Sequence, residues 1–168
     1  GRFDKAKRDI DNFGENYFTI GDVEISLFEM AWHLTGLEKY MVAMLCEEPW
    51  VEPLNDKVEA WSTGLALQLV RAGVDAIWLG EDLGSQTSTL ISPDDWRKKF
   101  KPRHKRMIDR LRKENPEIII IMHSDGAVAP LIDDFIEIGV DVYNPVQPNV
   151  AGSDPQELKD RYGKNISF

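Results

Sequence analysis

Two similar stretches of sequence decide the fold: Gly73-Val74-Asp75-Ala76 and Gly139-Val140-Asp141-Val142, with the apolar run Ile118 to Met122 (IIIIM) between them. In each stretch a glycine stands where a helix is expected to end, and a short apolar strand follows it. One further strand lies between the two stretches, so their spacing corresponds to two units of about 33 residues, the size of a βα unit. Alternating strands and helices of this size predict a parallel sheet with right-handed crossovers.

The same pattern extends to both sides of these stretches. The predicted strands cover Tyr17 to Asp22, Ala76 to Leu79, Ile118 to Met122 and Asp141 to Tyr143, and a further strand begins at Ile166 to Phe168. A closed eight-stranded barrel needs about 250 residues, whereas this chain has 168. We therefore expect one α/β domain, residues 1–168, that is either an open doubly wound sheet or a partial (β/α)8 TIM barrel. The strand that begins near Phe168 favours the partial barrel.

Helices are predicted between the strands. One runs from near Leu54 to Gly73, with an apolar face made by Val58, Trp61, Leu65 and Leu69. Ser92 followed by a proline is a typical helix start, and Pro102 predicts a kink or a restart soon afterwards.

The helix after Pro102 is rich in arginine and lysine as far as Lys113. This pattern predicts a solvated helix face, with a patch that binds a partner or a phosphate as the alternative. His104 in this helix and His33 earlier in the chain are expected to be surface or packing residues.

Composition excludes several classes of function. The formal net charge is −9, with 29 acidic and 20 basic side chains, so binding to nucleic acid or to an anionic membrane surface is not expected. The single cysteine, Cys46, excludes an internal disulfide and a zinc site made only of cysteines. The charged start, Gly1 to Asp4, does not resemble a secretory signal, and no apolar run is long enough to span a bilayer. We expect a cytoplasmic protein.

Polar side chains follow the predicted strands, where active sites of parallel α/β proteins gather. The first strand end carries Asp22 and Glu24, and the next carries Glu81, Asp82, Ser85 and Gln86. The third carries His123, Ser124 and Asp125, and the fourth carries Asn144 and Gln147. All these residues should lie at one edge of the sheet.

His123 and Asp125 are alternate residues, so at a strand end they face the same side. Such a pair can bind one metal ion or act as proton donor and acceptor. The alternative is a histidine that caps a helix and an aspartate that ties a turn before Gly126. The Glu81-Asp82 pair is open in the same way between metal ligands, supporting carboxylates and a turn, and Asn144 can be part of a polar turn.

Motifs of several other enzyme classes are absent from the sequence. It contains neither GxGxxG nor GxxxxGK[ST], so no phosphate-binding loop supports a nucleotide-binding fold. It also lacks the GxSxG nucleophile elbow.

Four segments resemble the uroporphyrinogen decarboxylase superfamily, which includes corrinoid-linked methyltransferases. They are WLGEDLG (Trp78 to Gly84), LISPDDWRKKFKPR (Leu90 to Arg103), HSDG (His123 to Gly126) and GVDVYNPVQP (Gly139 to Pro148). The resemblance runs from about Tyr17 to Phe168 and implies a (β/α)8 barrel of which this chain covers about strands 3 to 7.

The resemblance implies two activities. The first is cofactor-free decarboxylation of a porphyrinogen-like substrate, as in porphyrin biosynthesis, with Glu81, Asp82, His123 and Asp125 as catalytic residues. The second is methyl transfer to a corrinoid or a thiol, in which His123 and Asp125 hold a divalent metal such as zinc, with Glu81 as a further ligand. A catalytically silent binding barrel is the third reading.

Further expectations concern the substrate and partners. The substrate-binding residues are Trp32, which stands where the decarboxylases tend to carry a tyrosine, and Gln86, Asn144 and Gln147. The expected partners are a small-molecule substrate and, for methyl transfer, a corrinoid protein. A partial barrel exposes strand edges, so we also expect a homo-oligomer or association with the missing half.

Overall fold

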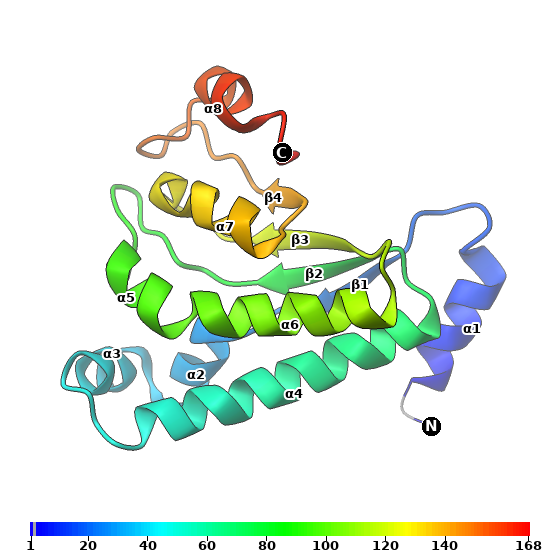
Figure 1. Cartoon of the computed structure of the whole chain (residues 1–168), viewed down its shortest axis with the longest axis horizontal. Coiled ribbons are helices and arrows are strands. Elements are labelled where there is room, and N and C mark those ends of the chain that lie inside the picture. Colours follow the sequence, from blue (N-terminus) through cyan, green and yellow to red (C-terminus); the bar gives the residue numbers. More distant parts are fainter. Residues whose placement is uncertain (2) are drawn as a thin grey trace.

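The computed structural model describes Gly1 and residues 3–168; Arg2, in the charged start of the sequence, lies outside the described residues. Its centre is a sheet of four parallel strands, β1 (Ile20–Val23), β2 (Ala76–Gly80), β3 (Ile119–His123) and β4 (Val142–Asn144). They lie side by side in chain order (Figure 1). The predicted parallel α/β fold is confirmed, and the sheet is consistent with part of a TIM barrel.

Helices alternate with the strands. They are α1 (Asp4–Phe13), α2 (Phe28–Thr35), α3 (Leu37–Leu45), α4 (Val51–Ala72), α5 (Pro93–Lys99), α6 (Lys101–Glu114), the short 3-10 helix η1 (Ala129–Leu131), α7 (Ile132–Ile138) and α8 (Pro155–Tyr162). Helices α1 and α2 were not predicted from the sequence. None of the helices in the described part of the chain is long and apolar enough to cross a membrane.

The predicted helix ends are confirmed. Gly73 ends α4 and Gly139 ends α7, both with a left-handed backbone (φ 103° and 95°) that glycine adopts without strain. Ser92 caps α5 by accepting a hydrogen bond from the Asp95 amide at 3.0 Å. The chain then restarts as α6, with Pro102 in the first turn.

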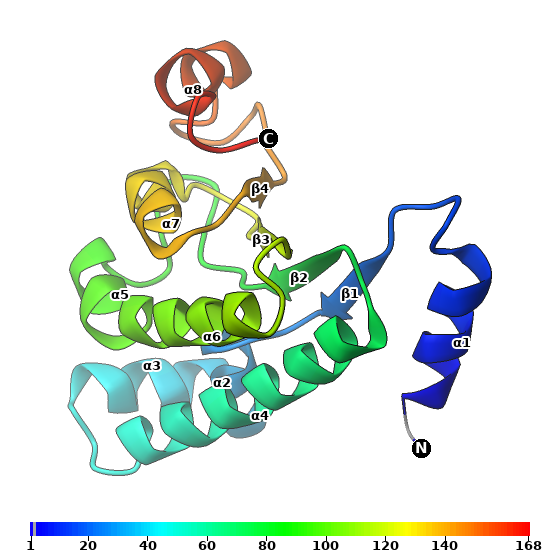
Figure 2. The same cartoon turned by 45° about the vertical axis from the view of Figure 1, so that its right-hand side comes forward.

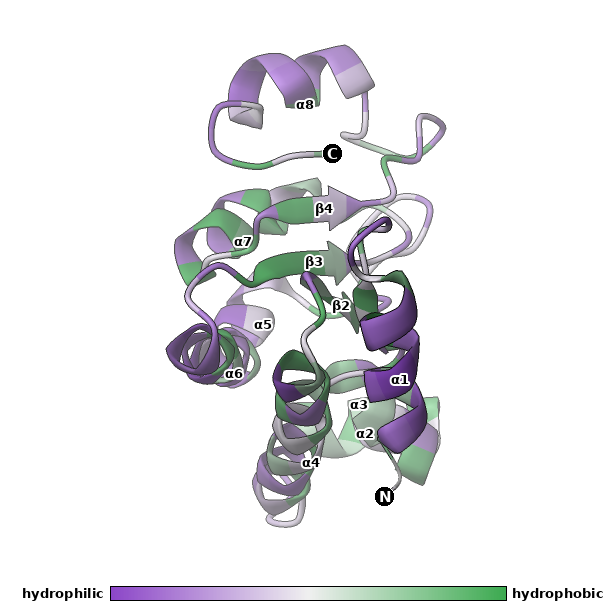
Figure 3. Cartoon of the chain, turned by 90° about the vertical axis from the view of Figure 1, so that its right-hand side faces the viewer, coloured by the Kyte–Doolittle hydropathy of each residue, from purple (hydrophilic) through white to green (hydrophobic). Residues whose placement is uncertain are grey.

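The two faces of the sheet differ in what covers them. Helices α4, α6 and α7 lie on one side of the strands, and α1 lies beside the β1 end (Figure 2). Side chains that point toward the large helices are fully buried: Ile77, Leu79, Ile120 and Met122. On the other face, the sheet register aligns Trp78 with Ile121 and Val142. Two residues further along each strand, it aligns Gly80 with His123 and Asn144. Strand β3 is hydrophobic along its length up to His123 (Figure 3), whereas β1 contains Asp22.

The face of α4 differs from the prediction. Trp61 is 51% exposed, whereas Val58, Ser62, Ala66 and Val70 are buried. The buried stripe is therefore displaced around the helix, because α4 packs its small residues against the sheet and α6. Pro53 stands inside the first turn of α4, where no helical hydrogen bond is lost.

The basic face of α6 is only partly solvated. The Arg103 residue is 8% exposed. Its guanidinium donates to Glu52 at 2.9 Å and to Asp56 at 3.2 Å, both on α4. Arg106 donates to Glu59 at 2.9 Å. The basic run therefore joins α6 to α4 through ion pairs at these positions.

Candidate functional site

Asp82, His123 and Asp125 converge at the carboxyl edge of the sheet. His123 is the last residue of β3, Asp82 follows β2 by two positions, and Asp125 follows β3 by two. One ligand atom from each lies within 4.8 Å of the other two. The convergence follows from the parallel strands, whose carboxyl ends share one edge.

The His123 ring is held from two sides. Its Nδ1 lies 3.0 Å from Oδ1 of Asn144, which is in register with it on β4. An amide oxygen only accepts, so Nδ1 is the donor in this hydrogen bond, and in the neutral ring Nε2 is then left to bind another ligand. The ring also stacks on Trp78, with centroids 5.1 Å apart and planes at 25°. His123 is thus fixed with Nε2 directed toward Asp82, 3.7 Å from Oδ1.

Backbone and amide contacts fix the two aspartates. Oδ1 of Asp82 accepts a hydrogen bond from the Asp125 amide at 3.0 Å. Oδ1 of Asp125 accepts one from Nε2 of Gln147 at 3.0 Å, and Oε1 of Gln147 accepts one from the Gly126 amide at 2.8 Å. No hydrogen bond to Oδ2 of either carboxylate is found among the described residues, and Oδ1 of Asp82, which accepts the Asp125 amide, is also the oxygen that lies 3.7 Å from Nε2 of His123.

Close packing of two loops holds this arrangement. Gly126 has φ 85°, and a Cβ there would lie 2.4 Å from the carbonyl carbon of Gly84. Only glycine fits where the loop after β2 meets the loop after β3.

The donor set fits a divalent cation. Two atoms bound to one tetrahedral zinc at about 2.1 Å lie about 3.4 Å apart, close to the 3.7 Å between His123 and Asp82. One imidazole and two carboxylates are ligands for zinc and for harder divalent ions. The single cysteine, Cys46, is exposed at the C-terminal end of α3 and is not part of this cluster.

The surroundings are acidic as well. Burial and the neighbouring Glu24 raise the pKa of Asp22, and the nearby His123 lowers it in part. Asp22 therefore lies near His123 on the β1 side, with Glu24 next to Asp22. This charge favours a cation and opposes an anionic ligand.

Glu81 is not part of the cluster. Its side chain is fully buried and points away from the Asp82 side chain, toward α2. Its carboxylate accepts hydrogen bonds from the Ser26 hydroxyl at 2.7 Å and from the Phe28 amide at 3.0 Å. It therefore lies at the N-terminus of α2.

Glu29 is a residue that the sequence analysis missed. Its Oε2 accepts a hydrogen bond from the Asp82 amide at 3.3 Å. Burial raises its pKa, with the charges of Asp82 and Glu81 adding to the rise and the Asp82 amide opposing it. The spacing Ser26-x-x-Glu29 is that of a capping box and could have indicated a helix start here, although in the structure Ser26 and Glu29 do not make the capping hydrogen bonds.

The predicted substrate-binding residues have different surroundings. Asn144 and Gln147 contact the cluster directly. Gln86 and Gln147 line a cavity of about 320 Å³ next to it, with Val146 and Pro148. Trp32 is half-buried on α2 and stacks on His33, with centroids 3.9 Å apart. Among the described residues no hydrogen bond or aromatic contact joins Trp32 to the cluster, and its role stays a prediction.

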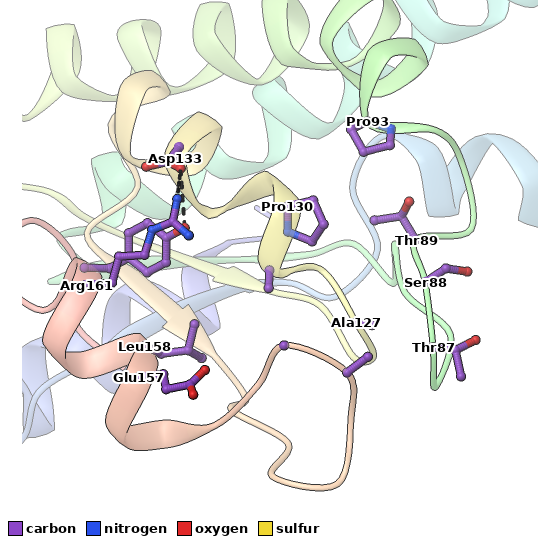
Figure 4. Close-up of a pocket in the computed structure, with 14 residues that line it drawn as sticks. Thr87, Ser88, Thr89, Pro93, Ala127, Pro130, Asp133, Glu157, Leu158 and Arg161 are labelled. Carbon is purple, nitrogen blue, oxygen red and sulfur yellow. Dashed lines mark hydrogen bonds and ion pairs between the residues drawn. The ribbon is translucent and has the colours of Figure 1, made fainter.

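A larger cavity than this one lies elsewhere. It has a volume of about 690 Å³ between the loop 87–89, the start of α7 and helix α8 (Figure 4). Arg161 on its wall is paired with Asp133 at 3.3 Å. Asp82, His123 and Asp125 do not line it.

Comparisons with known proteins agree with this fold. The family model described as Uroporphyrinogen decarboxylase (URO-D) matches residues 20–164. A solved structure described as a methyltransferase from Methanosarcina mazei superposes with a TM-score of 0.77 at 21% identity, over 95% of this chain and 44% of that one. This chain thus spans less than half the length of that protein. No match was found among curated proteins. The extent of the family match shows that the chain belongs to the uroporphyrinogen decarboxylase (URO-D) family.

Proposed function

We propose that this chain carries the cation site of a metal-dependent methyltransferase of the family. The observation that carries the proposal is the convergence of Asp82, His123 and Asp125 within 4.8 Å of one another. The likeness to a solved methyltransferase supports it at the level of the fold. The donor would be a small methylated molecule and the acceptor a corrinoid or a thiol, with a corrinoid protein as partner.

The three residues would hold a divalent ion such as zinc. When bound, such an ion lowers the pKa of a coordinated thiol or water and so activates it as a nucleophile. Asn144 keeps the proton of His123 on Nδ1, so that Nε2 is free to bind. Gln147 orients Asp125 from behind, and Gln86 and Gln147 form a polar subsite for the uncharged part of the substrate.

Decarboxylation of a porphyrinogen-like substrate is the second candidate. The description of the matching family model favours it. In that case His123 and Asp82 would transfer a proton to the carbon that loses carbon dioxide. The acidic groups around His123 argue against it, since Asp22, Asp82 and Asp125 would repel a substrate with several carboxylates.

Titration calorimetry with Zn²⁺ and Mn²⁺ on the 168-residue chain tests the proposal. The expected result is one site per chain, lost in His123→Ala and weakened by tenfold or more in Asp82→Asn. Asp133→Asn is the control, because Asp133 is exposed and outside the cluster. Equal affinity in all variants would contradict the proposed site.

An assay of turnover separates the two candidates. In a longer protein that contains this chain, methyl transfer predicts that a thiol demethylates methylcobalamin. The reaction is measured by the change in the absorption spectrum of methylcobalamin. Decarboxylation predicts that carbon dioxide is released from a porphyrinogen and that chelators do not affect the rate of this release. If neither occurs while the ion still binds, a binding barrel is the remaining reading.

A further inference from the structure

A buried ionisable pair lies behind the cluster. Glu81 and His104 are both 0% exposed, and Nε2 of His104 is 3.4 Å from Oε1 of Glu81. The His104 ring stacks on the buried Trp96, with centroids 5.9 Å apart. Neither ring nitrogen has a hydrogen-bond partner among the described residues. Apolar residues of similar size would often stabilise a core at least as well as such a pair, so stability alone does not account for it.

The Glu81 carboxylate closes the open end of α2. It accepts hydrogen bonds from the Ser26 hydroxyl and from the amides of Leu27, Phe28 and Glu29, the last at 3.2 Å. Helix α2 has no capping side chain of its own at this end. The carboxylate therefore satisfies the unpaired amides and the positive end of the helix dipole.

The first turn of α2 in turn holds Asp82. Oε2 of Glu29 accepts a hydrogen bond from the Asp82 amide at 3.3 Å, and Asp82 accepts one from the Asp125 amide. Successive residues at a strand end point to opposite sides. The Glu81 side chain thus contacts α2, whereas Asp82 faces the cluster. Glu29 connects the two residues, because its amide donates to Glu81 and its carboxylate accepts from the Asp82 amide.

We propose that Glu81 and His104 are positioning residues for the cluster of Asp82, His123 and Asp125. Glu81 anchors α2, and the anchored Glu29 fixes the backbone of Asp82. His104 occupies the space behind Glu81 and keeps its carboxylate turned toward α2. The inference rests on the proposed function in one respect, namely that this cluster is the cation site.

Two variants test the inference by Mn²⁺ affinity. Glu81→Gln keeps the shape but replaces one acceptor oxygen by a donor, and should weaken Mn²⁺ binding about tenfold, as substitutions behind metal ligands do. His104→Phe keeps the stacking on Trp96 and should weaken Mn²⁺ binding by a smaller factor than Glu81→Gln, because His104 acts only through Glu81. The matched control is Asp134→Asn, a buried carboxylate in α7 with no contact to the cluster.

A second measurement needs no metal. Hydrogen exchange of the Asp82 and Asp125 amides, followed by NMR, should be about tenfold faster in Glu81→Gln than in Asp134→Asn, after allowance for their stabilities. If Glu81→Gln does not fold, His104→Phe supplies both measurements.

The outcomes are distinct. Equal exchange at Asp82 in the variants and the control, with Mn²⁺ affinity within twofold of the wild type, would overturn the positioning role. Absence of Mn²⁺ binding in the wild type with faster exchange in Glu81→Gln would overturn the cation site and support the positioning role.

Discussion

Asn144 gives the sharpest test of how the cluster is built. Replacement by leucine keeps the size of the side chain and removes the only acceptor found for Nδ1 of His123 among the described residues. The lost hydrogen bond, 3.0 Å long and half-buried, is worth about 0.5–1.5 kcal/mol. That energy corresponds to a metal affinity reduced about twofold to thirteenfold. The His123 ring should also populate both tautomers.

Two measurements on Asn144→Leu follow from this. Calorimetry with Zn²⁺ gives the affinity, and the ¹⁵N shifts of the His123 ring give the tautomer in the metal-free chain. Asn149→Leu is a suitable control, because Asn149 is exposed on the loop after β4. Unchanged affinity together with a single, unchanged tautomer would refute the reasoning.

Three other predictions concern stability and assembly. Asp134 has only 7% of its side chain exposed; burial raises its pKa, but hydrogen bonds from Arg97 and Lys101 outweigh this and leave the pKa lowered. The contribution of Asp134 to the free energy of unfolding is therefore full at pH values above its unfolded pKa near 3.8 and is lost as the pH falls through its folded pKa. In urea unfolding, Asp134→Asn should lower the free energy of unfolding by about 2 kcal/mol at pH 7 and by much less near pH 2. Equal losses at the two pH values would count against this. Gly126→Ala should destabilise the chain by about 3 kcal/mol or more in urea unfolding, because of its positive φ and the contact with Gly84; a loss under about 1 kcal/mol would show that the loops can separate. Exposed Tyr17, Phe18 and Ile20 at the β1 edge predict self-association in light scattering, and a monodisperse monomer at high concentration would speak against it.

Much of the fold could be predicted from local sequence. Gly73 and Gly139 mark helix ends because the left-handed backbone favours glycine, and the apolar runs after them become β2 and β4. The face of α4 could not be predicted in this way. Two stripes of similar hydrophobicity are present, and the contact with α6 decides that Trp61 faces solvent.

The cluster was predicted in part. His123 and Asp125 follow from the alternation at a strand end, and Asp82 from its place after β2. Which of two adjacent carboxylates faces the cluster depends on the strand register, so Glu81 could not be assigned to α2 from sequence. His104 carried a signal that was not used, since it lies four residues after Phe100 and four before Ile108, both in the core.

Metal binding by the isolated chain tests the central claim most directly. All three proposed ligands lie within this chain, so the measurement needs neither the substrate nor the rest of a barrel. Calorimetry with Zn²⁺ should give one site per chain in the wild type and none in His123→Ala, with similar unfolding free energies for the two proteins. Failure of the wild type to bind, or equal binding by a folded His123→Ala, would contradict the account.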